Sequence, residues 1–256
     1  MNIFDMDKNS LPEQVQINKE NIKNLMDLVG LTPNFTNPNL LINSNFKINQ
    51  RGAASYSTVN QYTVDRWMLV SGSVTVESVG ITLNGTIQQI LESAPDGDIS
   101  VSSNDGDISY NAGVVTISTT TPTLILWAKL EIGTIKTPYC VPDPATELMK
   151  CQRYYFKINS DVSQNRYLIY RTARSAYAMY DRQIYFPVVM RTLPTITLFS
   201  ASTNASGKLY NLTQSTDQAF STGYITQASF QIGNTNGDMS ANDNIGGYYA
   251  ADAEIY

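Results

Sequence analysis

The chain has 256 residues, of which 15% are charged, and its net charge is -5 at pH 7. This length suffices for two domains of ordinary size, and the acidic balance gives no general attraction to nucleic acid or to an anionic membrane. The sequence contains no histidine, which excludes Ser-His and Cys-His catalytic pairs and removes the commonest metal ligand. Cys140 and Cys151 form no CxxC motif, so we expect two unpaired thiols, with one disulfide as the alternative.

The first residues, MNIFDMDKN, lack the apolar stretch of a signal peptide. No run of about 18 apolar residues, the length that a membrane-spanning helix needs, occurs in the sequence. We therefore expect a protein that is made in the cytoplasm without a signal peptide and does not insert into a membrane.

Residues 10–29, SLPEQVQINKENIKNLMDLV, predict one helix in the N-terminal segment 1–30. Ser10 and Glu13 form a capping box, and Gly30 follows the last turn. Spacings of four and three place one polar and five apolar residues on a heptad seam: Leu11, Val15, Asn18, Ile22, Leu25 and Val29. Two interpretations remain open, an amphipathic helix packed on its own domain and a short parallel coiled coil whose register Asn18 fixes.

Residues 31–39 form a linker, and the pattern then changes to strict alternation across residues 40–140. In LILWAKLEIG the alternation predicts one strand with Leu124, Leu126, Ala128, Leu130 and Ile132 on one face. Turn signals such as PDGD, NDGD and NAG recur about every eight to twelve residues, which is typical of an antiparallel β-sandwich.

Residues 141–152, VPDPATELMKCQ, predict a proline-bearing connector with one helical turn, and residues 153–256 predict a second β region. We expect strands in RYLIYRT, AYAMYDRQIYFPVVM, TITLFS, YITQASFQIG and YYAADAEIY. The predicted fold class is all-β, with two antiparallel β-sandwich domains of jelly-roll type preceded by a short N-terminal helix.

Three segments, NLLINSNFKINQRG…YTVDRW, LWAKLEIGTIKTPY and ELMKCQRYY, carry a resemblance when taken in this order. The chain from about residue 38 onward resembles a family of bacteriophage tail-fibre and receptor-binding proteins. The resemblance implies that residues 40–140 form a sandwich like that of a carbohydrate-binding module, and that CQRYY opens a C-terminal receptor-binding β domain. The sequence departs from the family at 142–144, where PDP replaces the Arg-Pro-Tyr found in many relatives.

The first of these segments, NLLINSNFKINQRG…YTVDRW, is interpreted as a structural element and not as a binding or catalytic site. In FKINQRG, Phe46 and Ile48 alternate with polar residues as in a strand, and Gly52 permits a bend. Trp67 is large enough to anchor a sheet corner. Three charged residues of this segment are therefore interpreted as structural rather than ligand-contacting: Arg51, Asp65 and Arg66.

Twelve of the sixteen tyrosines follow residue 150 and alternate with arginines. Tyr and Arg supply rigid contact area with hydrogen-bonding tips, and flat rings suit the C–H faces of sugars. We expect ligand-binding residues among Tyr167, Tyr170, Arg171, Arg174, Tyr177, Tyr180 and Arg182. The alternative is that these rings fill a sandwich core and a seam between subunits.

Two acidic loops suggest a calcium site as a secondary interpretation, through Asp96, Asp98, Asp105 and Asp107. Asp-Gly is also a standard hairpin turn pair, and the turn interpretation is preferred, so we expect no cofactor. A glycosidase needs two carboxylates, and nothing in the spacing of Asp65, Glu77, Glu92 and Asp181 singles out a pair. We therefore expect no enzymatic activity.

The resemblance implies a virion protein that binds host cell-surface polysaccharide as a homotrimer, in which we expect segment 1–30 to be a trimeric coiled coil. The N-terminal segment would attach to another virion protein of the tail, baseplate or capsid. Two alternatives remain, a head-fibre or decoration protein on the capsid, and a carbohydrate-active enzyme or its accessory binding module.

Overall fold

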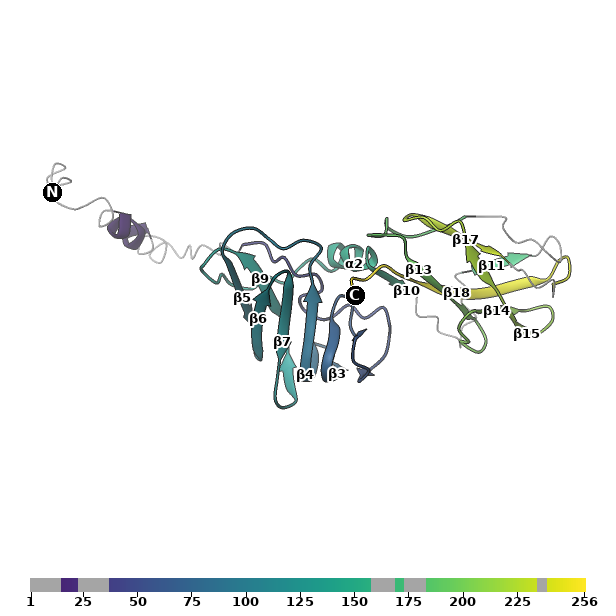
Figure 1. Ribbon diagram of the computed structural model, residues 1–256, viewed down its shortest axis with the longest axis horizontal. Helices are drawn as coiled ribbons and strands as arrows, with labels where there is room; N and C mark the ends of the chain where they lie inside the picture. Colours follow the sequence, from purple (N-terminus) through teal and green to yellow (C-terminus); the bar gives the residue numbers. More distant parts are fainter. Residues whose placement is uncertain (1–14, 23–36, 158–168, 173–182, 234–238) are drawn as a thin grey trace. The chain divides into compact units, whose positions relative to one another are not determined.

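The computed structural model describes residues 15–22, 37–157, 169–172, 183–233 and 239–256 (Figure 1). Its contacts divide the chain into two units, Met1–Asn37 and Pro38–Tyr256. In the first unit residues 15–22 are helical, and Val15 and Ile22 of the predicted seam are 49% and 56% exposed. Asn18 is exposed beside them. Three other seam residues lie outside the described residues: Leu11, Leu25 and Val29.

The second unit begins with a seven-stranded antiparallel sheet in the order β1-β3-β4-β7-β6, with β2 beside β3 and β8 beside β4. These strands are β1 (Ser55–Tyr56), β2 (Gln61–Tyr62), β3 (Met68–Val76), β4 (Ile81–Ile90), β6 (Asp107–Asn111), β7 (Val114–Ser118) and β8 (Thr123–Ile125). A separate antiparallel pair joins β5 (Ile99–Ser103) to β9 (Ala128–Ile132). Fully buried side chains from both sheets, among them Ile87, Ile117 and Leu130, share one hydrophobic core with Trp67, which directly precedes β3.

The NAG turn signal is confirmed as a tight hairpin, whereas PDGD and NDGD lie in loops between strands that do not pair with each other. Asn111 pairs with Val114, so β6 and β7 are joined by a two-residue loop. Both loop residues, Ala112 and Gly113, have positive φ angles of 45° and 86°, the backbone that matches the twist of a tight hairpin. Gly52 likewise has a φ of 78° in a turn.

Two strand predictions in this region were wrong. LILWAKLEIG is not one strand, because β8 pairs with β4 and β9 pairs with β5. FKINQRG is irregular, because Phe46 has a φ of 58° and turns its ring into the core. In both places long-range contacts override the local alternation.

Residues 141–152 are more than a connector. They contain α2 (Pro144–Gln152), which begins at Asp143, whose carboxylate accepts a hydrogen bond from the Thr146 N–H. Pro144 occupies the first helical turn, where no N–H partner is lost. The expected helical turn is thus present, but the helix is longer than the one turn predicted.

The remaining strands surround β18 (Asn244–Asp252), which pairs with four others. One edge of β18 meets β10 (Tyr155–Lys157) and β11 (Ile169–Thr172), and the other meets β13 (Thr195–Ser200) and β14 (Lys208–Asn211). β15 (Thr216–Ala219) extends this sheet beyond β14, while β12 (Ile184–Tyr185), β17 (Ser229–Gly233) and β16 (Ser221–Gly223) form a three-stranded sheet. Figure 1 shows β18 running through this whole region.

A second hydrophobic core lies in this region and is rich in aromatic rings. Phe230 meets Tyr249 edge-on with ring centroids 4.8 Å apart, and Phe186 stacks on Phe230 at 5.7 Å. The described residues are thus mostly β, in several antiparallel sheets, and the all-β prediction is confirmed at that level. No helix among them is long and apolar enough to cross a membrane.

Candidate functional site: a polar joint between distant segments

Asn43 connects three parts of the chain that are far apart in sequence. Its N–H donates to Glu147 Oε2 of α2 at 2.7 Å, and its side-chain amide donates to the carbonyls of Ile48 and Asp65 at 2.9 Å. Its own carbonyl accepts a hydrogen bond from the Trp67 indole at 3.1 Å. The residue has a φ of 52°, a conformation that asparagine tolerates better than most residues. Asn43 therefore fixes the NLLINSNF segment against both YTVDRW and α2.

Within LWAKLEIGTIKTPY, the loop residue Thr137 folds back onto a buried ion pair between Lys129 and Glu131. Lys129 and Glu131 are each 1% exposed and lie 3.0 Å apart, Nζ to Oε2. Lys129 Nζ donates to the Thr137 hydroxyl at 2.6 Å, and Glu131 accepts from the Thr137 N–H at 2.8 Å. Both faces are therefore buried between residues 128 and 131, because Ala128 and Leu130 lie in the core while Lys129 and Glu131 form the ion pair. Leu124 and Ile132, at the two ends of the predicted apolar face, are 42% and 52% exposed.

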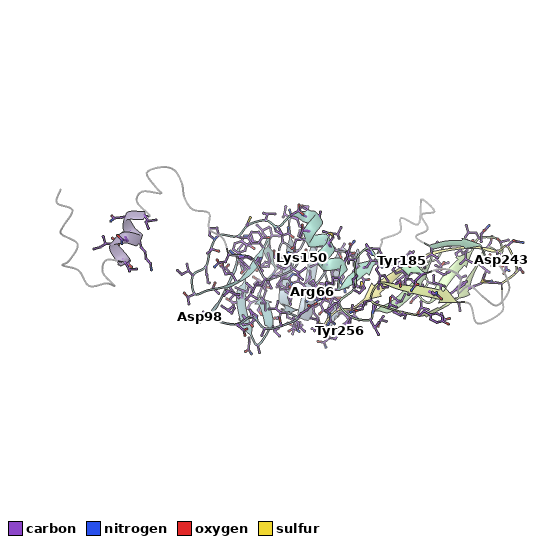
Figure 2. All side chains as sticks on the ribbon, turned by 90° about the horizontal axis from the view of Figure 1, so that it is seen from above. Arg66, Asp98, Lys150, Tyr185, Asp243 and Tyr256 are labelled. Carbon is purple, nitrogen blue, oxygen red and sulfur yellow. The ribbon has the colours of Figure 1, made fainter. Side chains whose placement is uncertain are left out.

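A cluster of charged and aromatic groups, which we call the joint, connects YTVDRW and QRG to CQRYY and the C-terminus. It comprises Gln50, Arg51, Asp65, Arg66, Tyr154, Tyr155 and Glu254. Figure 2 labels Arg66 in the middle of residues 38–256, with Asp98 and Asp243 toward the two ends. The Ala253 N–H donates to the Tyr154 carbonyl at 2.7 Å, which fixes the end of the chain against CQRYY.

The two arginines of the joint use the same carboxylate. Arg66 forms an ion pair with Glu254 and donates to the Ile90 carbonyl at 2.6 Å. Arg51 lies 3.3 Å from Glu254 and 3.6 Å from Asp65. Each guanidinium also covers a ring, Arg66 that of Tyr154 at 3.6 Å and Arg51 that of Tyr155 at 3.8 Å. Such stacking adds to the ion pair where water is excluded.

Burial dominates the electrostatics of the joint. Asp65 is 0% exposed and Arg66 1%. Loss of water raises the pKa of Asp65 to about 7, although Arg51 and two hydrogen bonds from Gln50 favour the charged form. Burial likewise raises the pKa of Tyr154 and Tyr155 to about 12. Arg51, Asp65 and Arg66 are engaged in ion pairs that hold distant segments together, as the structural interpretation of these residues expects.

A pocket of about 250 Å³ opens beside the joint. Arg66 and Tyr154 belong to both the joint and the pocket wall. Glu92 at the pocket is paired with Arg153, and both of these side chains are partly exposed. The lining consists of Leu40, Ile42, Arg66, Gln89, Leu91, Glu92, Ser93, Pro95 and Tyr154.

The predicted ligand-binding set is largely outside the described residues. Tyr170 and Arg171 lie on β11, where they pair with Gly246 and Ile245 of β18. The other members of the set are outside the description: Tyr167, Arg174, Tyr177, Tyr180 and Arg182. Among the described tyrosines after residue 150, Tyr248 and Tyr249 are buried, whereas Tyr185, Tyr224 and Tyr256 are at least 70% exposed. The set stays a prediction.

The four acidic-loop residues are all exposed. Asp105 and Asp107 line an open polar hollow of about 460 Å³, and neither Asp96 nor Asp98 is part of its lining. Gly97 and Gly106 have positive φ angles, as the turn interpretation expects. Within the described part of the chain, no three His, Cys, Asp or Glu side chains are grouped to hold a metal ion.

The structure also bears on the two cysteines and on two carboxylates that the sequence did not mark. Cys140 is exposed, Cys151 is buried, and both are free, so the prediction of unpaired thiols is confirmed. Sequence analysis missed Glu254 and Glu147, the two carboxylates on which the joint and Asn43 depend. The letters ELMKCQRYY were a signal for Glu147, whereas nothing local marked Glu254.

Comparison of the chain with protein-family models, with curated proteins and with solved structures finds no match in any of the three.

Proposed function

We propose that this chain is a non-enzymatic structural protein of a tailed-phage virion, a tail-fibre or receptor-binding protein that adheres to host cell-surface glycans. In this proposal each β region is a sandwich of jelly-roll type. The N-terminal helix joins three chains as a coiled coil and attaches them to another virion protein. Three weak sites on one trimer would raise the avidity by orders of magnitude without tight binding at any single site.

One observation carries the proposal. The three segments on which the family resemblance rests are separated in sequence but meet in the structure. The first and third interlock through Asn43, Glu147 and the joint, and the second meets the first where the Ala128 N–H donates to the Ser44 carbonyl at 2.8 Å. Residues that recur together across a family and meet in one structural unit support a shared architecture. A unit that ties two β regions together suits a protein that must transmit force from a bound surface to a particle.

The seam supports the trimer. Val15 and Ile22 are exposed on the helix of a single chain, with Asn18 between them in the heptad. Exposed apolar residues at heptad spacing are covered when helices associate, and one polar seam residue selects the register. A short helix of this kind is marginal alone, so the β regions would contribute to the trimer contact.

The experiment is electron microscopy of purified particles from a culture that carries this gene, labelled with an antibody against residues 38–256. Label at the tail or baseplate supports the proposal. Label over the capsid supports the head-fibre alternative instead. Particles that carry no label, while the protein is found free in the culture, contradict a virion protein and favour the accessory-module alternative.

A further inference from the structure

The pocket beside the joint has a shape and a chemistry that the architectural role of the joint does not use. At about 250 Å³ it is smaller than the roughly 300 to 1,000 Å³ of sites for drug-sized ligands. It therefore fits a group about the size of one ring. The rest of a longer ligand would lie outside it.

The pocket walls are built by fixed contacts. Gln89 is 0% exposed, and its side-chain amide accepts from the Ile42 N–H at 2.9 Å and donates to the Ile42 carbonyl at 2.8 Å. Leu91 is held by a hydrogen bond from its N–H to the Gly113 carbonyl at 2.9 Å. A wall whose backbone is already hydrogen-bonded loses little conformational entropy when a ligand binds.

The lining combines an apolar surface with a few polar groups. Leu40, Ile42, Leu91 and Pro95 supply aliphatic area, while the Glu92 carboxylate and the Ser93 hydroxyl supply an acceptor and a second polar partner. The charges are already paired, Arg66 with Glu254 and Glu92 with Arg153. A neutral ligand is therefore favoured over an ion.

We propose that the pocket binds one neutral sugar ring, a hexose or an N-acetylhexosamine, as a terminal unit or branch of a glycan. The C–H face of the ring would lie on the aliphatic wall, and its hydroxyls would donate to Glu92 and accept from Ser93. This inference rests on the proposed function in naming a glycan. It places a binding site in the first β region, apart from the tyrosine-rich set in the second.

The test is saturation-transfer NMR on the full chain with glucose, galactose, N-acetylglucosamine and N-acetylgalactosamine, followed by titration. At least one sugar is expected to bind. Ser93→Trp, which puts an indole at the exposed mouth, should abolish binding, and Ser57→Trp, at another exposed serine, should not. Glu92→Gln should weaken binding about tenfold, the effect of losing one hydrogen bond to a charged group. Glu77→Gln is its exposed control and should have no effect.

Binding of none of the four sugars overturns the inference, as does binding that Ser93→Trp leaves intact or that Ser57→Trp reduces equally. Tighter binding of glucuronic acid than of glucose overturns the proposal that the ligand is a neutral sugar. If Ser93→Trp lowers the melting temperature, its loss of binding could come from unfolding, and the effect of Glu92→Gln on sugar affinity then tests the pocket by itself. The antibody labelling separates the two proposals, because a chain can label the tail and bind no sugar here, or bind a sugar here without labelling a particle.

Discussion

The two β regions bury different kinds of side chain. Between residues 38 and 157 the buried set includes Asp65, Arg66, Lys129, Glu131 and Glu147. Between 183 and 256 the described residues bury two charged side chains, Asp243 and the joint residue Glu254. The second region instead packs aromatic rings around β18. Apolar packing is non-directional, while hydrogen-bonded charges demand one geometry. The first region therefore fixes which segments meet, and the second contributes mainly burial.

The largest expected effect comes from breaking the joint. Arg66→Met should lower the free energy of unfolding by about 3 to 5 kcal/mol, because it leaves Glu254 buried with only Arg51 beside it. Arg153→Met, at the exposed pair with Glu92, should cost about 0 to 1 kcal/mol. Both are measured by urea denaturation. Equal losses in the two variants would contradict the account, and Arg66→Met/Glu254→Gln should recover part of the loss.

The stability of the second region should fall most when a side chain is added where β18 packs closely against its neighbours. A methyl group on Gly247 would lie 2.4 Å from Leu209 Cδ2 and 2.5 Å from the Phe199 carbonyl oxygen. Gly247→Ala should therefore cost about 1 to 3 kcal/mol in unfolding free energy. Gly97→Ala meets no atom within 4 Å and should cost only about 1 kcal/mol, through its positive φ. A smaller loss at Gly247 than at Gly97 in thermal denaturation would contradict close packing at β18.

Asp65 of the joint should also make the folding stability of the chain depend on pH. Burial raises the pKa of Asp65 to about 7, while the unfolded residue titrates near about 3.9. The folded chain holds this proton more tightly, so stability from Asp65 is full below about pH 4 and is lost as the pH rises to about 7.

Asp65→Asn should remove this slope, measured as the difference in unfolding free energy between variant and wild type from pH 4 to 8. Glu131, whose pKa is lowered mainly by hydrogen bonds from Thr137 against the effect of burial, contributes a slope of opposite sign. That slope is present in both proteins and cancels in the difference. A difference that does not change with pH would rule out the protonated Asp65.

The smallest effect concerns the cysteines, which lie on either side of the start of α2. Cys140 is exposed, and burial raises the pKa of the Cys151 thiol well above its usual value. A thiol reagent such as Ellman's should therefore modify one thiol per native chain and two after unfolding, without a change in stability. Fast reaction of both thiols in the native chain would show that α2 opens readily.

Local patterns predicted what depends on neighbours in the sequence. The Ala112-Gly113 hairpin and TITLFS as β13 follow from turn chemistry and alternation. The start of α2 was also readable, because Asp143 before Pro144 is a helix N-terminus signal, but the prolines were read as a connector. The burial of Lys129 and Glu131 was not readable, since it depends on Thr137 folding back over them. The pairing of Arg66 with Glu254 joins residues 188 positions apart, and no local signal carries it.

The central claim is a trimeric adhesin, and its most direct test is the solution mass from light scattering coupled to size exclusion, at two protein concentrations. The account predicts one stable species of three times 28.3 kDa, and a loss of that species in Val15→Asp/Ile22→Asp if the seam holds it. A monomer at both concentrations would contradict the trimeric adhesin and favour an accessory binding module.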